Sequence, residues 1–267
     1  MKLTMLGTGN ALVTECYNTC FVLEENGEYF MVDGGGGNGV LRQLKSAGLD
    51  WKAMRHIFVT HKHLDHITGV MWMVRMICQA MARGDYEGEA VISSHKEVLE
   101  IIADMAEKLL TKKQARFVGD RLKLKKLHDG DTVRVIGRET TFFDIDSTKA
   151  KQYGFCMDLG NGRRLTCCGD EPYSERERPY VLGSDWLLHE AFCLYDQRDI
   201  FDPYEKHHST VRDACETVER LKVKNLVLYH TEDRTIAQRK KLYTEEGRRY
   251  FSGGLYVPDD LETIDLG

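Results

Sequence analysis

A buried strand at residues 55–60 runs directly into the stretch THKHLDH, which places four metal-binding side chains within six residues. These side chains are His61, His63, Asp65 and His66. We expect the first three to alternate along an extended segment and the fourth to break the alternation where a helix begins. Side chains that diverge in this way favour two adjacent ions, about 3.5–4 Å apart, over a single ion. The fold must therefore bring further ligands to this strand end.

Strands dominate both halves of the sequence, and helices are interspersed between them. We predict a hairpin over 19–36 with Asn26 and Gly27 at its turn, because this pair favours the tight turns of hairpins. Further strands are predicted at 2–7, 90–94, 131–137, 140–146, 153–170, 185–192 and 225–230. Helices are predicted at 39–49, 67–84, 96–110, 209–222 and near the C-terminus. This order suits two sheets that are covered by helices on their outer faces.

The composition is that of an ordinary globular protein, and we expect one domain over residues 1–267. Hydrophobic residues make up 42% of the chain and charged residues 30%, and the net charge of −5 argues mildly against a large basic surface for nucleic acids. The eight cysteines form no CxxC pair, so we expect buried free thiols. The first ten residues do not resemble a signal peptide and no run of 18 apolar residues occurs, which predicts a cytoplasmic protein.

THKHLDH resembles the metal-binding signature of the metallo-β-lactamase superfamily. That resemblance implies an α/β fold, an αββα sandwich of two mixed β-sheets flanked by helices. Asp33 in MVDGGGG is similar to the first motif of the superfamily, Asp170 at the end of LTCCGD to its metal-bridging aspartate, and His230 to its last metal histidine. The similarity extends over roughly residues 3–235 and implies a hydrolase with two divalent metal ions, zinc by resemblance.

Two further motifs are similar to those of the ribonuclease Z group within the superfamily. They are LLHEAF at 187–192 and HHST at 207–210. In that group a glutamate orients a histidine that assists departure of the leaving group, which assigns these roles to Glu190 and His208. His207 is the alternative by one position, and His208 is preferred because it directly precedes Ser-Thr. Asp65 is expected to bind the second metal and also to orient the nucleophile.

The chain departs from the family at the third histidine that normally binds the first metal. No histidine lies between His128 and His189, and Asp146 occupies the expected place, with Asp144 as the alternative. The resulting prediction is a first site made of His61, His63, Asp146 and Asp170, and a second site made of Asp65, His66, Asp170 and His230. An added carboxylate would favour harder ions such as Mn²⁺ or Fe²⁺ relative to zinc. Alternatively, the substitution leaves the first site weak or empty.

A second departure concerns the substrate. Ribonuclease Z proper carries a long arm that grips tRNA, inserted between the third-ligand strand and the bridging aspartate. Here only 24 positions separate Asp146 from Asp170, and a hairpin fills them. The basic stretch at 112–126 could touch a phosphate-bearing substrate, although a solvated helix face and loop is the simpler interpretation. The short connection favours a small substrate over tRNA.

The sequence therefore predicts a dinuclear metal-dependent phosphodiesterase that acts on a small phosphodiester or nucleotide-type substrate through a hydroxide shared by the two ions. His63 stands where the superfamily's iron oxidoreductases place a glutamate, which favours hydrolysis over redox chemistry. The alternatives are a ribonuclease Z acting on tRNA 3′ ends, a lactonase or thioesterase-type hydrolase, and a non-catalytic binding protein on the same fold. The expected partners are a small-molecule or RNA substrate and a second copy in a homodimer, with no membrane.

Overall fold

Two seven-stranded sheets form the centre of the computed structural model, which describes residues 1–267. The first sheet contains, in spatial order, β14 (Thr263–Asp265), β1 (Lys2–Gly7), β2 (Cys20–Glu25), β3 (Glu28–Val32), β4 (Met54–Phe58), β5 (Ala90–Ser94) and β6 (Leu122–Lys126). The second contains β13 (Gly254–Tyr256), β12 (Asn225–Tyr229), β11 (Trp186–Glu190), β10 (Arg163–Cys167), β9 (Tyr153–Gly160), β8 (Arg138–Asp144) and β7 (Thr132–Val135).

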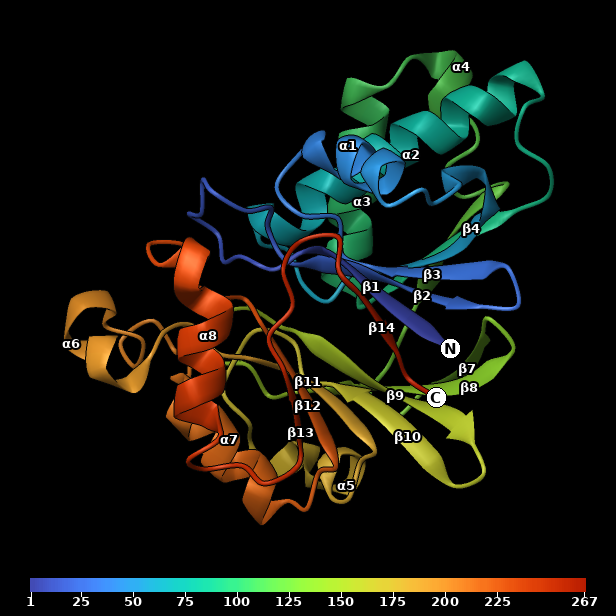
Figure 1. The fold of residues 1–267 in the computed structure, drawn as a ribbon. Helices are drawn as coiled ribbons and strands as arrows, with labels where there is room; N and C mark the ends of the chain where they lie inside the picture. The colour runs from blue at the N-terminus through green and yellow to red at the C-terminus, as the bar shows by residue number, and fades with distance from the viewer.

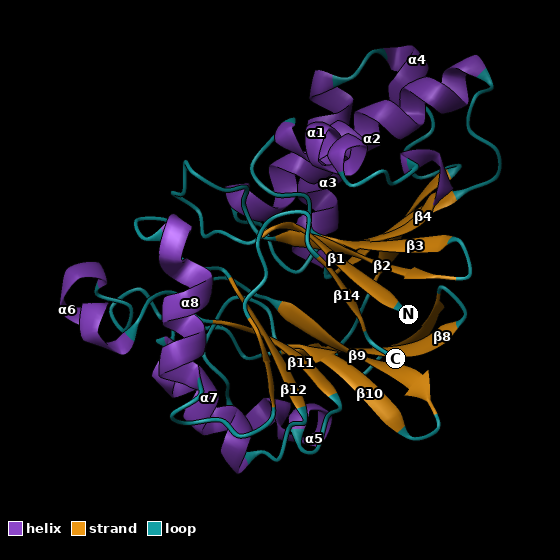
Figure 2. Cartoon of the chain, viewed as in Figure 1, coloured by secondary structure: helices purple, strands orange, loops and turns teal.

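Helices cover the outer face of each sheet (Figures 1 and 2). Those beside the first sheet are α1 (Gly39–Ser46), α2 (Leu64–Arg83), α3 (Lys96–Leu109) and α4 (Lys112–Ala115). Those beside the second are α5 (Arg178–Val181), α7 (Val211–Arg220) and α8 (Ile236–Gly247), while α6 (Arg198–Phe201) lies to one side. The predicted αββα sandwich is confirmed. None of the helices combines the length and the apolar character needed to cross a membrane.

Aromatic side chains fill much of the space between the sheets. Phe30 of β3 meets Phe155 of β9 edge-to-face, with ring centroids 5.5 Å apart. Phe58 of β4 packs at 4.8 Å against Phe142 of β8. Successive residues of a strand point to opposite faces, so each strand sends alternate apolar residues into this layer and the others toward the helices. The packing holds the two sheets together and fixes the separation of their edges.

The candidate ligands lie where parallel strands end. β3, β4 and β5 are parallel neighbours in the first sheet, and β10, β11 and β12 are parallel neighbours in the second. The carboxyl ends of parallel neighbours meet at one edge, which is where ligands bind in many α/β proteins. Asp33 follows β3, Asp170 follows β10 and His230 follows β12. The topology therefore gathers residues that are up to about 200 positions apart in the sequence.

The basic stretch at 112–126 forms α4 and β6. β6 is the edge strand of the first sheet, with sequence LKLKK. Lysines on an edge strand hinder pairing with the edge of another molecule. Lys123 also forms an exposed ion pair with Glu89, at 3.3 Å. Residues 122–126 are therefore a strand and not part of the helix face and loop that we expected, and protection of the sheet edge accounts for the lysines of β6.

A buried carboxyl group behind β10 leads to a prediction about stability. Glu177 is 1% exposed, and its Oε2 accepts a hydrogen bond from the Ser174 amide. Burial, reinforced by the charge of Glu171, raises the pKa of Glu177 from its ordinary value near 4.5 to about 8. A carboxyl pKa that is raised by folding contributes stability that is complete below about pH 4.5 and is lost as the pH rises through about 8.

We expect Glu177→Gln to flatten this pH dependence, because an amide cannot ionise. The stability of the variant minus that of the wild type should grow by up to about 1.4 kcal/mol per pH unit between pH 5 and 8. Urea unfolding of both proteins across this range measures the difference. A constant difference would show that Glu177 is ionised in the folded protein at both ends of the range.

Candidate metal centre

The strand-end motif is part extended and part helical. His61 and His63 follow β4 in an extended segment, and α2 begins at Leu64 with His63 at its N-cap. Asp65 and His66 thus occupy the first turn of α2, so the prediction that Asp65 continues the extended alternation is wrong. The helix starts early because an acidic residue in the first turn interacts favourably with the positive end of the helix dipole. The turn also separates Asp65 from His61 and His63.

Glycines in the DGGGGNG stretch allow α2 to approach the end of β3 closely. A Cβ atom on Gly34 would lie 2.2 Å from the Val70 backbone nitrogen, and one on Gly69 would lie 1.8 Å from the Gly34 carbonyl oxygen. The Gly34 amide also donates a hydrogen bond of 2.9 Å to the His66 carbonyl. Only residues without a side chain fit this contact, and it fixes the first turn of α2 against the sheet.

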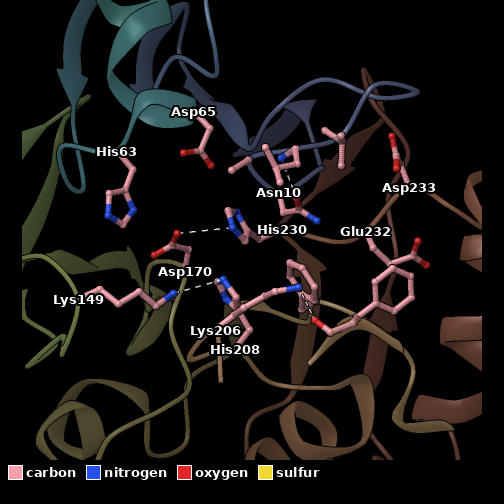
Figure 3. A pocket seen from close by; sticks show the side chains of 15 residues that line it. Asn10, His63, Asp65, Lys149, Asp170, Lys206, His208, His230, Glu232 and Asp233 are labelled. Atoms are coloured by element: carbon pink, nitrogen blue, oxygen red, sulfur yellow. Dashed lines mark hydrogen bonds and ion pairs between the residues drawn. The ribbon is translucent and has the colours of Figure 1, made fainter. Parts of the chain in front are cut away.

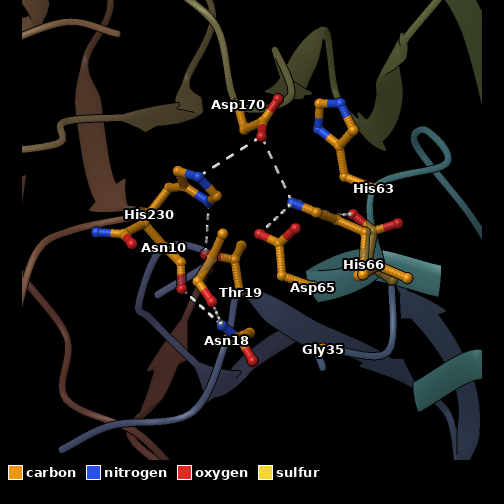
Figure 4. A network of polar contacts seen from close by, with 12 residues as sticks. Asn10, Asn18, Thr19, Gly35, His63, Asp65, His66, Asp170 and His230 are labelled. Atoms are coloured by element: carbon orange, nitrogen blue, oxygen red, sulfur yellow. Dashed lines mark hydrogen bonds and ion pairs between the residues drawn. The ribbon is translucent and has the colours of Figure 1, made fainter. Parts of the chain in front are cut away.

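The predicted ligands, with one exception, form two adjacent groups. Their ligand atoms lie within 4.8 Å of one another inside each group. The first group is His61, His63 and Asp170, and the second is Asp65, His66 and His230. Figure 4 shows Asp170 lying between the residues of the two groups, with Asp65 and His66 entering from α2 and His230 from the opposite side. This division matches the two sites that the sequence predicts, apart from Asp146.

One oxygen of Asp170 lies at the junction of the two groups. Its Oδ2 is 3.6 Å from the Nε2 atom of His61, 3.5 Å from that of His66 and 3.5 Å from that of His230. Ligands placed tetrahedrally about 2.0–2.2 Å from an ion are separated from one another by roughly 3.3–3.6 Å. The spacing therefore fits metal ligands, and the central position of Asp170 suits a carboxylate that bridges two ions.

Three of the histidines present Nε2 to this junction because their Nδ1 atoms are engaged elsewhere. These contacts join His61 to Thr60 Oγ1 at 2.9 Å, His66 to Asp33 Oδ2 at 2.8 Å, and His230 to Thr19 Oγ1 at 3.2 Å. Such outer hydrogen bonds fix the orientation of a ligand ring. Asp33 also accepts bonds from the Thr60 amide and hydroxyl. No motif in the sequence marks Thr19 or Thr60 as site residues, and the motif that contains Asp33 does not reveal its contact with His66.

The electrostatics favour imidazoles that can bind a cation. Burial lowers the pKa of His61 well below its usual range and lowers the pKa of His230 to about 4. Both rings are therefore neutral near pH 7 and retain a lone pair for a metal ion. Burial works against ionisation of Asp170, but the neighbouring His61, together with His66 and His230, holds its pKa well below the usual range. The carboxylate is thus charged.

The pKa and the contacts of His66 also indicate a cation-binding position. Burial opposes its protonation, yet the carboxylates of Asp65 and Asp33 raise the pKa of His66 well above its usual range. The His66 Nε2 atom is buried and makes no well-aligned hydrogen bond, although oxygens of Asp65 and Asp170 lie 3.3 and 3.5 Å away. Such an atom, facing two carboxylates, suits a metal ligand. A bound cation would replace the proton and satisfy it, which is the usual coupling between metal binding and proton release.

Asp146 does not join either group. It is exposed, its backbone has a φ of 63°, and its amide donates a hydrogen bond to Asp144 Oδ1. Asp144 forms an ion pair with Lys151, in which Lys151 Nζ lies 3.0 Å from Asp144 Oδ2. The geometry therefore gives no support to the prediction that Asp146, or Asp144, supplies the third ligand of the first site. The left-handed turn at Asp146, together with its hydrogen bond to Asp144, sets it apart from both ligand groups.

We expect Asp146→Ala to retain the metal content of the wild type, because its carboxylate lies outside both ligand groups. Metal analysis of the two proteins after dialysis provides the measurement. His63→Ala serves as the comparison, since His63 belongs to the first group and its removal should lower the content. Loss of one equivalent from Asp146→Ala would show instead that the loop brings this carboxylate to the ion.

The predicted Glu190 and His208 pair is present. Glu190 Oε2 lies 3.5 Å from His208 Nδ1, and Glu190 is fully buried at the end of β11. Its other oxygen, Oε1, accepts a bond of 2.5 Å from the Ser209 amide, which holds the carboxylate in place. The His208 ring stacks on Phe192 at 4.9 Å with an interplanar angle of 7°. His208 is thus oriented by Glu190 and Phe192, whereas the rival His207 is exposed and contacts Thr148.

A cavity of about 530 Å³ opens in front of these groups (Figure 3). His208 and His230 face it together with His63, Asp65 and Asp170. Its walls also include residues that the motifs did not reveal, namely Asn10, Ala11, Leu12, Val13, Lys149, Phe192, Phe201, Lys206, Glu232 and Asp233. The site can therefore hold a small ligand between its metal-binding groups, a histidine and an apolar wall.

Comparison with known families decides the relationship of the chain. The sequence pattern of the family described as Anti-Pycsar protein Apyc1 matches residues 1–250. The chain belongs to this Apyc1 family. The match extends from β1 to α8 and includes every residue of the two ligand groups.

Other relatives of this Apyc1 family member carry the same fold. A ribonuclease Z from Thermococcus sibiricus is 24% identical over 315 positions, covering 100% of this chain and 97% of the relative. YhfI from Bacillus subtilis, a metallo-beta-lactamase fold protein, gives a TM-score of 0.79 at 17% identity and covers 98% of both chains. The short form of human tRNase Z gives 0.74 at 20% identity and covers 100% of both. The predicted metallo-β-lactamase fold is confirmed, and the similarity to ribonuclease Z agrees with the predicted resemblance.

Proposed function

We propose that the protein is a metal-dependent phosphodiesterase with two divalent ions, acting on a small phosphodiester or nucleotide-type substrate. The observation that carries this proposal is the joint placement of two ligand groups, linked at Asp170 Oδ2, and the Glu190 and His208 pair around one cavity. The relatives named ribonuclease Z support cleavage of phosphodiester bonds. A metal-dependent hydrolase of phosphoesters agrees with all of these observations.

The ions would be held by the two ligand groups, with Asp170 shared between them. When bound, they supply an activated water and stabilise negative charge on the phosphate. The donors are mostly imidazole nitrogens, which suit zinc. A preference of the first site for Mn²⁺ or Fe²⁺ would require a carboxylate from Asp146, and this residue lies outside both groups. We therefore propose zinc as the resident metal, and elemental analysis of purified protein identifies it.

Residues of the chain position the reacting groups. Asp65 extends from the first turn of α2 into the cavity, where its carboxylate can hold the attacking water in line with the phosphorus atom. His208 faces the same cavity and can pass a proton to the leaving oxygen, and the Glu190 carboxylate stabilises the charged ring before transfer. Because burial excludes water from Glu190, its charge acts on His208 with little screening.

The size of the site favours a small substrate. The cavity of about 530 Å³ is of the usual size for a small-molecule site. β9 and β10 form a short hairpin where ribonuclease Z proper has its arm, and the alignment with the Thermococcus relative leaves at least 48 of its 315 positions without a counterpart among these 267 residues. Cleavage of tRNA precursors is the second candidate, because the relatives are named for it.

Hydrolysis of bis(p-nitrophenyl) phosphate by protein loaded with Zn²⁺ or Mn²⁺ tests the proposal. We expect turnover that is lost in Asp65→Ala, because this variant lacks both a metal ligand and the group that orients the water. A tRNA precursor assayed in parallel separates the second candidate. Absence of turnover in protein that contains two ions would refute the phosphodiesterase and favour a lactonase, a thioesterase-type hydrolase or a non-catalytic binding protein.

A homodimer and a cytoplasmic location stay predictions. Sedimentation equilibrium of the purified protein measures the first, and fractionation of the source cells measures the second. Neither is required for the chemistry described above, because all the ligand atoms and the Glu190 and His208 pair come from one chain.

A further inference from the structure

We propose that Lys149 is a substrate-binding residue whose ammonium group holds a non-bridging oxygen of the phosphodiester beside His208. The inference rests on the proposed function for the nature of the substrate, and on the geometry of the loop between β8 and β9 for the role of the lysine. In the family pattern, this loop leads to the third metal histidine. In this chain it carries a cation into the cavity instead.

The loop is tied to the strand end that carries Asp170. Gln152 and Asp170 bond reciprocally, since Gln152 Nε2 donates to Asp170 Oδ1 at 2.5 Å and the Asp170 amide donates to Gln152 Oε1 at 2.7 Å. The next residue, Glu171, accepts a bond from the Ser147 hydroxyl at 2.5 Å and one from the Thr148 amide at 3.3 Å. The backbone on both sides of Lys149 is therefore anchored near the bridging carboxylate, while the lysine itself is exposed.

The ammonium group of Lys149 is directed at His208. Its Nζ donates to His208 Nε2 at 3.3 Å, and Figure 3 shows this contact on the cavity side of the ring. A lysine has only donors, so His208 Nε2 accepts this bond when no substrate is present. When the ammonium group binds the substrate instead, Nε2 is free to carry the proton for the leaving oxygen. The lysine thus marks the atom of His208 that would face the leaving group. A phosphate oxygen bound to Nζ would lie next to that atom.

The charge of Lys149 is not neutralised by another side chain. No carboxylate forms an ion pair with it, whereas Lys151, two positions along, pairs with Asp144 at 3.0 Å. Lys206, the other lysine of the cavity, donates to the Phe201 carbonyl and lies 5.4 Å from the centre of the Phe192 ring. Both lysines therefore lack a carboxylate partner, and of the two it is Lys149 that contacts His208.

An anionic substrate needs such a cation at this place. Apart from the metal ligands Asp65 and Asp170, two carboxylates line the cavity, from Glu232 and Asp233. They repel a phosphodiester unless positive charge offsets them. Lysine binds phosphate as a compact point charge and does not require the planar geometry of an arginine. The ligand groups lie on one side of the cavity and Lys149 on the side of His208, so the phosphate would be held between them (Figure 3).

Lys149→Met tests the proposal, because it keeps the aliphatic stem and removes the charge. We expect the kcat/KM for bis(p-nitrophenyl) phosphate to fall about 10- to 100-fold, as for loss of a hydrogen bond to a charged group, with a raised KM and unchanged metal content. The affinity for inorganic phosphate, measured by calorimetry on the metal-loaded protein, should fall about tenfold or more. Lys149→Arg should retain part of the kcat/KM and part of the phosphate affinity.

Lys151→Met is the matched control on the same loop, since it removes a charge that Asp144 already neutralises. It should leave both measurements within twofold of the wild type. The proposal is overturned if Lys149→Met also stays within twofold in both. If the wild type shows no phosphodiesterase activity but phosphate affinity still depends on Lys149, the proposed function fails and the anion site stands.

Discussion

Asp170→Asn is expected to abolish metal-dependent hydrolysis. Asparagine keeps the shape of the side chain and an oxygen that can accept the bond from Gln152, but it removes the negative charge at the junction of the two ligand groups. Metal ions contribute several kcal/mol to the stabilisation of a transition state, so the rate should fall by about 10³-fold or more. No other single substitution in the cavity removes a contact shared by both groups.

Two measurements separate this effect from damage to the fold. Metal analysis of Asp170→Asn should show fewer bound ions than the wild type, and circular dichroism should show an unchanged fold. Asp158→Asn on the neighbouring strand β9 makes the same chemical change at an exposed position and should behave as wild type. Full activity of Asp170→Asn would rule out a bridging role for this carboxylate.

His208→Ala is expected to have the second largest effect, provided that the leaving group needs a proton. General acid catalysis contributes roughly 10²- to 10⁴-fold. The loss should therefore be of this size for a thymidine dinucleotide, whose leaving group is an alkoxide. It should be smaller for bis(p-nitrophenyl) phosphate, because p-nitrophenolate leaves as a stable anion. Comparison of kcat on the two substrates measures the role of the proton directly.

Glu190→Gln should also lower kcat more on the dinucleotide than on bis(p-nitrophenyl) phosphate, but by less than His208→Ala does. The amide oxygen can still accept the bond from the Ser209 amide, but the charge that stabilises a protonated His208 is lost. We expect a loss of more than about tenfold on the dinucleotide, as for removal of a carboxylate that orients a catalytic histidine. His207→Ala is the control, because this neighbouring ring is exposed. Equal losses on both substrates in His208→Ala would argue for a binding role without proton transfer.

Much of the site could be predicted from local sequence. Ligands at the ends of buried strands stand out because hydrophobic runs such as 55–60 and 225–230 stop at charged or ring nitrogen donors. His61, His63 and His66 are recognisable in this way, Asp170 and His230 followed from the resemblance to the superfamily, and all five lie in the two ligand groups. Their motifs are local, so the pattern survives in the linear chain. The choice of His208 over His207 also followed from the local motif, and its place beside Glu190 agrees with it.

Features that depend on contacts between distant segments could not be predicted in the same way. The short strands β13 and β14 were missed, because each has only three residues and exists only through pairing with β12 and β1. The helical position of Asp65 depends on where α2 begins against the glycines that follow β3. A local pattern has no information about such partners.

Most of the strands and helices and the ligands at the end of β4 followed from local sequence, because hydrophobic periodicity is a local property. The resemblance to the metallo-β-lactamase superfamily supplied the sandwich fold and the other ligands. The tertiary structure alone decided which side chains of the loop between β8 and β9 face the cavity. Asp146 turns outward in a left-handed conformation, while Lys149 reaches His208, although both lie in the same polar stretch. The direction of each side chain there is set by backbone torsions and by the anchors Glu171 and Gln152, which belong to the folded chain.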